Sequence, residues 1–258
     1  MREVWVLAGR ELRSFLRTPL GYAILAVYAL VSGLVFVTLL FILREQMLQA
    51  TPMPGSPRLP AVSLQLTLVA PYFYNVASLL LFVVPFVTMR AFAEERRSRR
   101  LEVLISYPLR VWQLVIGKFL GAVGFTLLLL AVSVLHMILL ALISAPGAAA
   151  VLGALLGLLL FALALVAIGV CVSSLVVGQV EAAVLTLGLF LLSAMVGGVL
   201  RPGAAGLGRL IANLSPLYQY QSLSAGLLAP GSLLFFASII VLALALTIRG
   251  VDLIKWRG

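Results

Sequence analysis

An uncharged run from Phe119 to Val180 is the feature that most constrains the fold of this chain. About 20 apolar residues in a helix are enough to cross the ~30 Å hydrocarbon core of a membrane, so this run is too long for one span. The segment SAPGAAA at residues 144–150 is its natural break. The run therefore predicts two membrane-spanning helices joined by a short turn.

The composition extends this interpretation to the whole chain. Of its 258 residues, 63% are hydrophobic and 10% are charged, and the mean hydropathy is +1.20. Soluble domains carry about 25% charged residues. The basic residues lie at the ends of apolar runs, so the net charge of +10 indicates membrane topology and contact with lipids rather than nucleic acid. We predict an all-α polytopic membrane protein with one transmembrane domain, residues 1–258.

Six spans are predicted from the uncharged runs. They are expected at residues 20–43, 72–89, 119–143, 151–176, 182–200 and 232–249. Residues 44–60 contain four prolines and are expected to form an irregular loop. Pro71 is expected to separate a short interfacial helix from the second span, and residues 201–231 to form a re-entrant or surface-lying helical pair.

The N-terminal segment 1–17 is predicted to hold an amphipathic interfacial helix over residues 3–17. At 100° per residue, its apolar face carries Val4, Trp5, Ala8, Leu12, Phe15 and Leu16. Its opposite face carries Arg10, Arg13 and Arg17. Such a helix lies at the membrane surface with its arginines toward water and lipid phosphates. The alternative is a simple positive flank of the first span. Pro19 is expected to end the helix.

The distribution of Lys and Arg predicts the orientation. The N-terminal segment holds four of these residues, the loop at residues 90–118 holds seven and the C-terminal tail three, against four in the loops of the other side. Positively charged loops stay in the cytoplasm. Both termini and the charged loop are therefore expected in the cytoplasm.

Several function classes lack the residues that they need. The six predicted spans contain no carboxylate and no paired charges, which disfavours ion-coupled transport. One His and one Asp are too few for a zinc-protease or paired-aspartate site, so no metal site and no enzymatic activity are expected. Gly117 and Lys118 are followed by Phe119 where a phosphate-binding loop needs Ser or Thr. The chain therefore has no visible energy source of its own.

The charged loop at residues 90–118 combines seven of the eighteen basic residues with three of the eight acids. Residues 90–105 are expected to continue the second span as a helix, and residues 106–108 to break it. A stripe through Leu109, Trp112, Ile116 and Phe119 then leads into the third span. Such a rigid element joined to two spans can move both. The alternative is a solvated loop that only fixes topology.

The run PFVTMRAFAEERRSRRLEVLISYPL in this loop resembles the cytoplasmic signature of ABC-2 type transporter permeases. The matching residues are Ala93, Glu94, Glu95, Arg96, Leu101, Glu102, Leu104 and Pro108. The stretches RELRSFLRTPLGYAILAVYALVSGLVF, GKFLGA and SSLVVGQVEAAVLTL also agree. The TPLGY start and the MR-x-F-A-E-E run are most similar to the gliding-motility-type subgroup. Arg99 and Arg100 stand where the family usually has Gly-Thr.

The resemblance implies a six-span half-transporter that pairs with a second copy or a paralogue and exports a substrate. Separate ABC ATPase subunits would bind ATP and Mg, so this chain would hold no cofactor. The implied ATPase-coupling residues are Glu94, Glu95, Arg96, Arg99, Arg100, Glu102 and Pro108. The implied secondary contacts with the ATPase or with lipid are Arg10, Arg13, Arg17 and Glu181. The alternatives are a non-transporting membrane scaffold or assembly subunit and, less favoured, a channel or ion-coupled carrier.

Some further residues each allow two interpretations. His136 in the third span is expected either to share a hydrogen bond between helices or to lie on a substrate path. Glu181 either caps the N-terminus of the fifth span or contacts the ATPase. Two glycine pairs have the G-x-x-x-G spacing that allows close helix approach, within the chain or at a dimer seam: Gly117 with Gly121, and Gly153 with Gly157.

Overall fold

The computed structural model describes residues 2–49, 64–97, 110–144, 147–199, 213–224, 226 and 229–255. Within these residues every regular element is a helix, and six helices are long and apolar enough to cross a membrane. They are α2 (Pro19–Gln49), α3 (Ala70–Thr88) with the π-helical turn η1 (Gln65–Val69), α6 (Val111–Ile143), α7 (Ala148–Leu175), α8 (Gln179–Val199) and α11 (Pro230–Lys255). The predicted all-α, six-span fold is confirmed.

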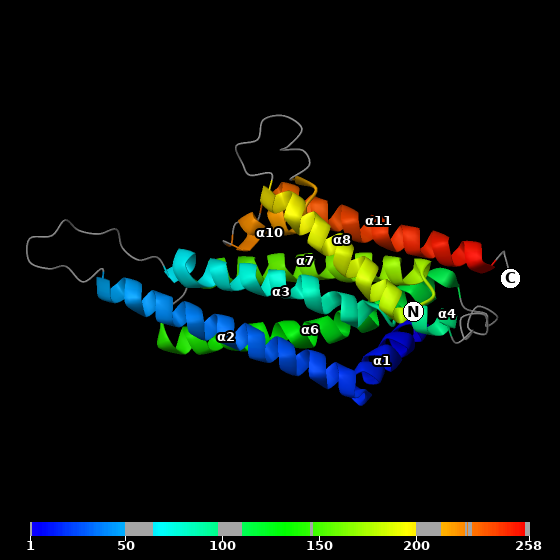
Figure 1. The fold of residues 1–258 in the computed structure, drawn as a ribbon, viewed down its shortest axis with the longest axis horizontal. Coiled ribbons are helices and arrows are strands. Elements are labelled where there is room, and N and C mark those ends of the chain that lie inside the picture. The colour runs from blue at the N-terminus through cyan, green and yellow to red at the C-terminus, as the bar shows by residue number, and fades with distance from the viewer. Residues whose placement is uncertain are drawn as a thin grey trace, which may run out of the picture.

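Three shorter helices complete the described chain: α1 (Arg2–Arg17), α4 (Ala93–Arg97) and α10 (Pro216–Ser224). Figure 1 shows α1 and α4 at one end of the bundle, together with the end of α11. We call this the α4 end. The end of α2 and the start of α3 lie at the opposite end (Figure 1).

The corner between α1 and α2 follows directly from the sequence Thr18-Pro19-Leu20-Gly21. Pro19 is the first residue of α2, where its missing N–H costs no helical hydrogen bond. The Thr18 hydroxyl donates to the carbonyl of Phe15 at 3.1 Å. A Cβ on Gly21 would collide with that same carbonyl, so the corner requires glycine at this position. The prediction that Pro19 ends the first helix is confirmed.

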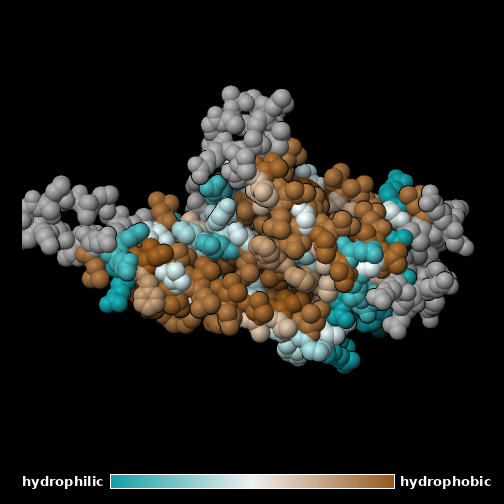
Figure 2. All heavy atoms as spheres, viewed as in Figure 1, coloured by the Kyte–Doolittle hydropathy of each residue, from teal (hydrophilic) through white to brown (hydrophobic). Residues whose placement is uncertain are grey.

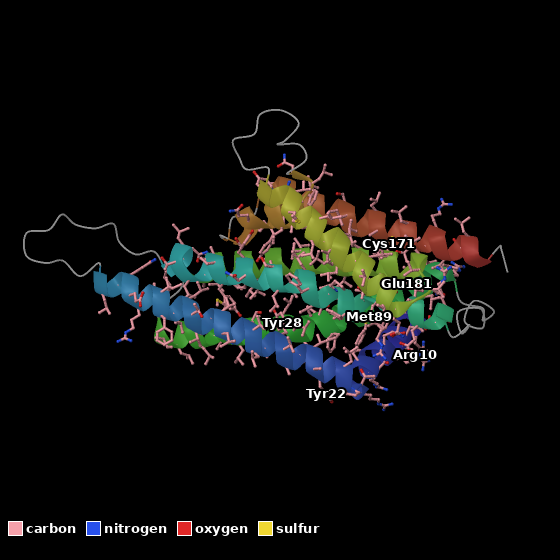
Figure 3. All side chains as sticks on the ribbon, viewed as in Figure 1. Arg10, Tyr22, Tyr28, Met89, Cys171 and Glu181 are labelled. Carbon is pink, nitrogen blue, oxygen red and sulfur yellow. The ribbon has the colours of Figure 1, made fainter. Side chains whose placement is uncertain are left out.

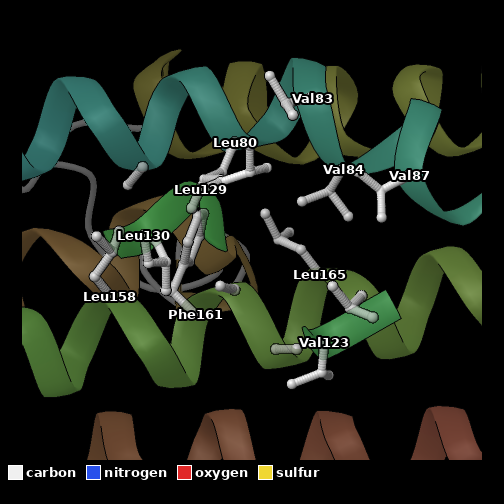
Figure 4. Close-up of a cluster of buried hydrophobic side chains, with 14 of the residues drawn as sticks. Leu80, Val83, Val84, Val87, Val123, Leu129, Leu130, Leu158, Phe161 and Leu165 are labelled. Carbon is white, nitrogen blue, oxygen red and sulfur yellow. The ribbon is translucent and has the colours of Figure 1, made fainter. Parts of the chain in front are cut away.

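The core lies around α3 and α7, which are the two most buried spans. Helix α7 packs against α3, α6, α8, α10 and α11. Figure 4 shows the centre of this packing, where Leu80 of α3, Leu129 of α6 and Phe161 of α7 meet. The spans α2, α8 and α11 expose apolar side chains instead, and these form the brown band in Figure 2. This band is the surface that a membrane would cover.

Helix α10 packs inside the bundle through the glycine pair of α7. A Cβ on Gly153 would lie 2.7 Å from the Gly226 carbonyl oxygen, and one on Gly157 would lie 2.7 Å from Leu223 Cβ. Gly226 has φ +81°, a left-handed conformation that glycine adopts without strain. The Gly153 pair therefore serves a contact within the chain. Of the predicted helical pair at residues 201–231, residues 201–212 lie outside the described residues.

Two local predictions about spans are wrong. Pro71 does not separate two helices, because η1 continues directly into α3 and Pro71 lies in the first turn of α3. The loop predicted from residue 44 begins later, because α2 continues to Gln49.

Candidate functional site

Residues 90–105 were predicted to continue the second span as a helix. The structure shows a break instead, directly after α3. Helix α3 ends at Thr88, residues 89–92 form a turn, and α4 begins at Ala93. The side chain of Phe92 and that of Ala93 are completely buried. The turn and α4 are therefore packed against the bundle at the α4 end; Figure 3 labels Met89, the first residue of the turn.

Ser173 of α7 holds the start of α4 in place. Its hydroxyl oxygen accepts hydrogen bonds from the backbone N–H groups of Phe92 at 3.1 Å and Ala93 at 3.2 Å. The same hydroxyl donates to the carbonyl of Met89 at 3.2 Å. The first N–H groups of a helix have no partner within it, so a side chain from another helix satisfies them here. Ser173 is fully buried, which makes these bonds costly to lose.

Arg96 joins the same two helices from the opposite direction. Its guanidinium Nη1 donates to the carbonyl of Ser174 at 2.7 Å. Ser174 lies in the last turn of α7, where carbonyl groups lack helical partners and a positive charge is favourable. Ser173 thus holds the start of α4 on the last turns of α7, and Arg96 holds the end of α4 there.

Lys118 of α6 forms the centre of a charged cluster at this end of the bundle. Its side chain is 2% exposed, and its Nζ lies 2.8 Å from Glu95 Oε1 of α4 and 3.1 Å from Glu11 Oε1 of α1. Arg10 Nη2 lies 3.8 Å from each of the same two carboxylate oxygens. We call these four residues the Lys118 cluster. It contains two positive and two negative groups, so the buried charges compensate one another.

The ring of Phe92 lies beneath the same ammonium group, with Lys118 Nζ 5.2 Å from the ring centroid. A cation at that distance over an aromatic face is attracted to it, more strongly where water is excluded. The turn before α4 therefore contributes to holding Lys118 as well. The Lys118 side chain therefore connects α6 to both α1 and α4.

Glu94 and Arg90 form the outer face of this region. The Glu94 side chain is 47% exposed, and Arg90 Nε lies 3.2 Å from its Oε2. Arg90 also donates to the Thr18 hydroxyl at 3.5 Å, at the corner between α1 and α2. Adjacent acids thus face in opposite directions: Glu95 points into the Lys118 cluster and Glu94 points outward.

The structure brings together some of the predicted coupling residues and leaves others undescribed. Glu94, Glu95, Arg96 and Arg10 meet around α4. Arg13 and Arg17 are exposed on α1. Arg99, Arg100, Glu102 and Pro108 lie outside the described residues. The roles assigned to all of them stay predictions.

Sequence reasoning missed the three residues that organise this site: Lys118, Glu11 and Ser173. In the sequence, Lys118 counts only as one of the seven basic residues of the 90–118 loop. Its signal was its position, since it is the last charge before the long uncharged run and directly precedes Phe119 of the predicted helical stripe. Ser173 carried no comparable signal, because a serine in an apolar helix is common.

The glycine pair of α6 explains how α1 comes close enough to join the cluster. A Cβ on Gly117 would lie 2.8 Å from Leu7 Cβ, and one on Gly121 would lie 2.5 Å from Glu11 Cβ. Both distances are too short for a real Cβ, so α1 packs directly on the bare backbone of α6. On the predicted apolar face of α1, Val4, Ala8 and Phe15 are buried against the bundle, whereas Trp5 is 70% exposed. Helix α1 is therefore packed on protein on one side rather than lying on lipid with its whole apolar face.

His136 lies in a hydrogen-bonded network in the middle of the bundle. Its Nδ1 shares a hydrogen bond with the Tyr72 hydroxyl at 2.9 Å, and the Tyr28 hydroxyl shares one with Ser133 Oγ at 2.7 Å. We call these four residues the mid-bundle network. It connects α2, α3 and α6, so the prediction of a His bonded between helices is confirmed. The part of the chain that the structure describes holds no group of three His, Cys, Asp or Glu that could hold a metal.

Glu181 caps α8 from within its first turn. Its Oε2 accepts a hydrogen bond from the backbone N–H of Gly178 at 3.3 Å, just before the start of α8. A carboxylate in the first turn also favours the positive end of the helix dipole. The capping interpretation is confirmed, and a contact between Glu181 and an ATPase stays a prediction.

The comparisons with known proteins agree with this architecture. The family model described as ABC-2 family transporter protein matches residues 42–249, which include α3, α4, α6, α7, α8, α10 and most of α11. A comparison with curated proteins finds no match. The matched range holds the turn after α3, Glu95 and Lys118. Because it covers most of the chain, this protein belongs to the ABC-2 family of transporter proteins and is a multi-pass membrane permease.

Proposed function

We propose that this permease is the membrane subunit of an ATP-driven ABC exporter, works as a dimer and is moved by separate ATPase subunits that dock at α4. The observation that carries the proposal is the fixation of α4 to three other helices. Lys118 joins α4 to α1 and α6, and Ser173 and Arg96 join it to α7. A force applied at α4 is therefore passed to several helices at once.

The mechanism follows from these contacts. Glu94 and Arg90 offer a charged outer face to a docking subunit, while Glu95 and Arg96 hold the inner face of α4. Closure of two ATPases would move α4, and the ends of α6 and α7 would follow because their polar ties are buried. The ATPases would bind ATP and Mg. In this scheme the substrate leaves through the interface of two permease subunits, which are two copies or a copy and a paralogue.

The orientation belongs to the same proposal. The excess of Lys and Arg in the N-terminal segment, the 90–118 loop and the tail supports a cytoplasmic α4 end. In agreement with this distribution, Figure 2 shows hydrophilic side chains around the α4 end and an apolar band beyond it. We place the protein in a bacterial inner membrane. Within the family, the TPLGY and MR-x-F-A-E-E stretches support the gliding-motility-type subgroup.

The test is retention of the ATPase by the purified permease in lipid, together with stimulation of its ATP hydrolysis. Glu94→Ala removes an exposed carboxylate from α4, and Glu45→Ala removes an exposed carboxylate from the opposite end of the bundle as a matched control. We expect Glu94→Ala to weaken ATPase retention and Glu45→Ala to leave it unchanged.

A second variant separates docking from transmission. Ser173→Ala leaves the outer face of α4 intact and removes the acceptor for two buried N–H groups. We expect it to retain the ATPase with reduced stimulation. If no variant changes retention or stimulation, α4 is not the coupling element. If the ATPase binds and its activity is never stimulated, the alternative of a non-transporting scaffold gains ground.

A further inference from the structure

The face of α1 that points away from α6 forms an open groove of about 890 Å³. The groove is lined by Arg2, Trp5, Val6, Gly9, Arg10, Arg13, Ser14, Arg17 and Thr18. Its floor is the bare backbone at Gly9, where a Cβ would meet nothing within 4 Å. The opposite face of α1 is packed on α6, so the groove has a fixed position at the α4 end.

The described lining of the groove is strongly positive, and three of its four arginines have no acidic partner among the described residues. Arg2, Arg13 and Arg17 are exposed, and none of them has an ion-pair partner among the described residues. Arg10 contributes a fourth guanidinium, which is 56% exposed. Its distance of 3.8 Å from each carboxylate partner is long for an ion pair. None of the described lining residues is acidic. Guanidinium groups match phosphate by paired hydrogen bonds, so this arrangement suits a phosphate-bearing anion.

The groove is also apolar along one edge, where Trp5 is 70% and Val6 is 65% exposed. Exposed Trp among arginines is typical of the membrane–water interface, where the indole ring lies at the level of the lipid headgroups. The groove ends at Thr18, where α2 begins, and Tyr22 of α2 is 62% exposed. Figure 3 shows Arg10 and Tyr22 at the two sides of this corner. Beyond it, α2 presents its apolar surface.

We infer that the α1 groove binds the headgroup phosphate of an anionic phospholipid, whose acyl chains then follow the exposed surface of α2. A folded acidic protein surface would match the arginines. It would leave the apolar edge at Trp5 and Val6, and the adjoining surface of α2, without an equally suitable partner. A lipid satisfies the arginines and the apolar edge together. This site involves no ATPase, so it stands independently of the coupling proposed for α4.

Trp5 allows a direct test with the full-length protein. Trp112→Phe and Trp256→Phe leave Trp5 as the single tryptophan, inside the groove. Its fluorescence is measured in phosphatidylcholine nanodiscs that contain the same fraction of brominated phosphatidylglycerol or of brominated phosphatidylcholine. Bromine quenches tryptophan on contact, so we expect stronger quenching by the brominated phosphatidylglycerol. Equal quenching by both lipids would overturn the inference.

Paired variants identify the arginines responsible. Each basic side chain near an anionic membrane surface contributes about a fivefold gain in affinity, so Arg13→Gln with Arg17→Gln should lower the preference for phosphatidylglycerol by up to about 25-fold. The matched control is Arg110→Gln with Arg249→Gln, which removes two exposed arginines outside the groove. We expect it to keep the preference.

A third pair guards against loss of folding. Arg13→Lys with Arg17→Lys retains both charges and should restore most of the preference, while thermal melting shows that all variants stay folded. If the Gln pair keeps its preference for phosphatidylglycerol and instead fails to retain the ATPase, the groove is a protein-docking surface and the lipid site is refuted. If the control pair loses as much preference as the Gln pair, the effect reflects overall charge and the inference also fails.

Discussion

Two buried polar regions hold the helices of this permease together, and they are built from different chemistry. The Lys118 cluster at the α4 end uses charges to connect α1, α4 and α6. The mid-bundle network uses hydroxyl and imidazole groups to connect α2, α3 and α6. Helix α6 belongs to both regions. The end of α6 is therefore joined to its neighbours by charges, and its central part by neutral hydrogen bonds.

The difference follows from the surroundings of each region. At the centre of a membrane an ionised group is expensive, whereas neutral hydrogen-bonded pairs are tolerated and each contributes about 0.6 kcal/mol, at most about 1.7 kcal/mol. At the end of the bundle, buried charges can be supplied in compensating pairs. Removing one member of such a pair leaves the other uncompensated and costs about 3–5 kcal/mol. The centre is thus joined by weak, replaceable contacts, and the α4 end by contacts that fail together.

The largest expected effect is that of Lys118→Met. This change removes the buried cation between Glu11 and Glu95 and leaves them only Arg10, which is 56% exposed and 3.8 Å from each carboxylate. We expect the free energy of unfolding to fall by about 3–5 kcal/mol, measured by thermal or denaturant unfolding in detergent. ATPase stimulation should be lost with it, because α4 is no longer held to α6.

The control for Lys118→Met removes all the central charges together. Lys118→Met combined with Glu11→Gln and Glu95→Gln leaves no buried carboxylate uncompensated, so most of the lost stability should return. If the triple variant is as unstable as Lys118→Met alone, the damage comes from packing around Lys118. The charge-based contrast between the two regions would then be wrong.

A smaller effect is expected from Gly121→Ala, which tests the close contact that brings α1 to the Lys118 cluster. The added Cβ would lie 2.5 Å from Glu11 Cβ and 3.2 Å from the Ala8 carbonyl oxygen, so α1 must move away. Overpacking of this kind costs about 1–3 kcal/mol in unfolding free energy.

Gly124→Ala is the matched control on the same helix. Its Cβ would lie 3.5 Å from Leu12 Cδ2, which is an ordinary contact, and Ala is a better helix former than Gly by about 0.5–1 kcal/mol. We therefore expect equal or slightly higher stability, measured in the same unfolding experiment. Equal losses in the two variants would mean that the α1–α6 contact is not what limits substitution at Gly121.

The sequence predicted the spans because that information is local. The length of each uncharged run and the prolines between runs are enough to predict six helices, and Pro19 predicts the end of α1. Prediction failed where a tertiary contact overrides local preference. The helix expected over residues 90–105 is interrupted at residues 89–92, because Ser173 of a distant helix satisfies the backbone there.

The site was predicted only in part, for the same reason. Glu94, Glu95 and Arg96 could be singled out as a charged group, but the sequence does not show that Glu95 turns inward and Glu94 outward. The partner of Lys118 on α1 is Glu11, 107 residues away in the chain, and no spacing rule connects them. The sequence also does not show which part of the apolar face of α1 packs on protein, because the glycines of α6 set that contact: Leu7 is buried against Gly117 and Trp5 stays exposed.

The smallest effect is expected in the mid-bundle network, and it tests the other side of the comparison. Tyr28→Phe removes the hydroxyl that lies 2.7 Å from Ser133 Oγ, and Ser133→Ala removes its partner. A double-mutant cycle should give a coupling of about 0.6 kcal/mol and no more than about 1.7 kcal/mol, with ATPase stimulation unchanged. Tyr22→Phe is the control, because Tyr22 lies on the same helix with its side chain exposed. A coupling as large as the loss expected for Lys118→Met would show that the neutral hydrogen bonds stabilise the bundle as strongly as the charges do. Loss of ATPase stimulation in Tyr28→Phe would show that the centre of the bundle also transmits the motion. Either result would contradict the proposed difference between the two regions.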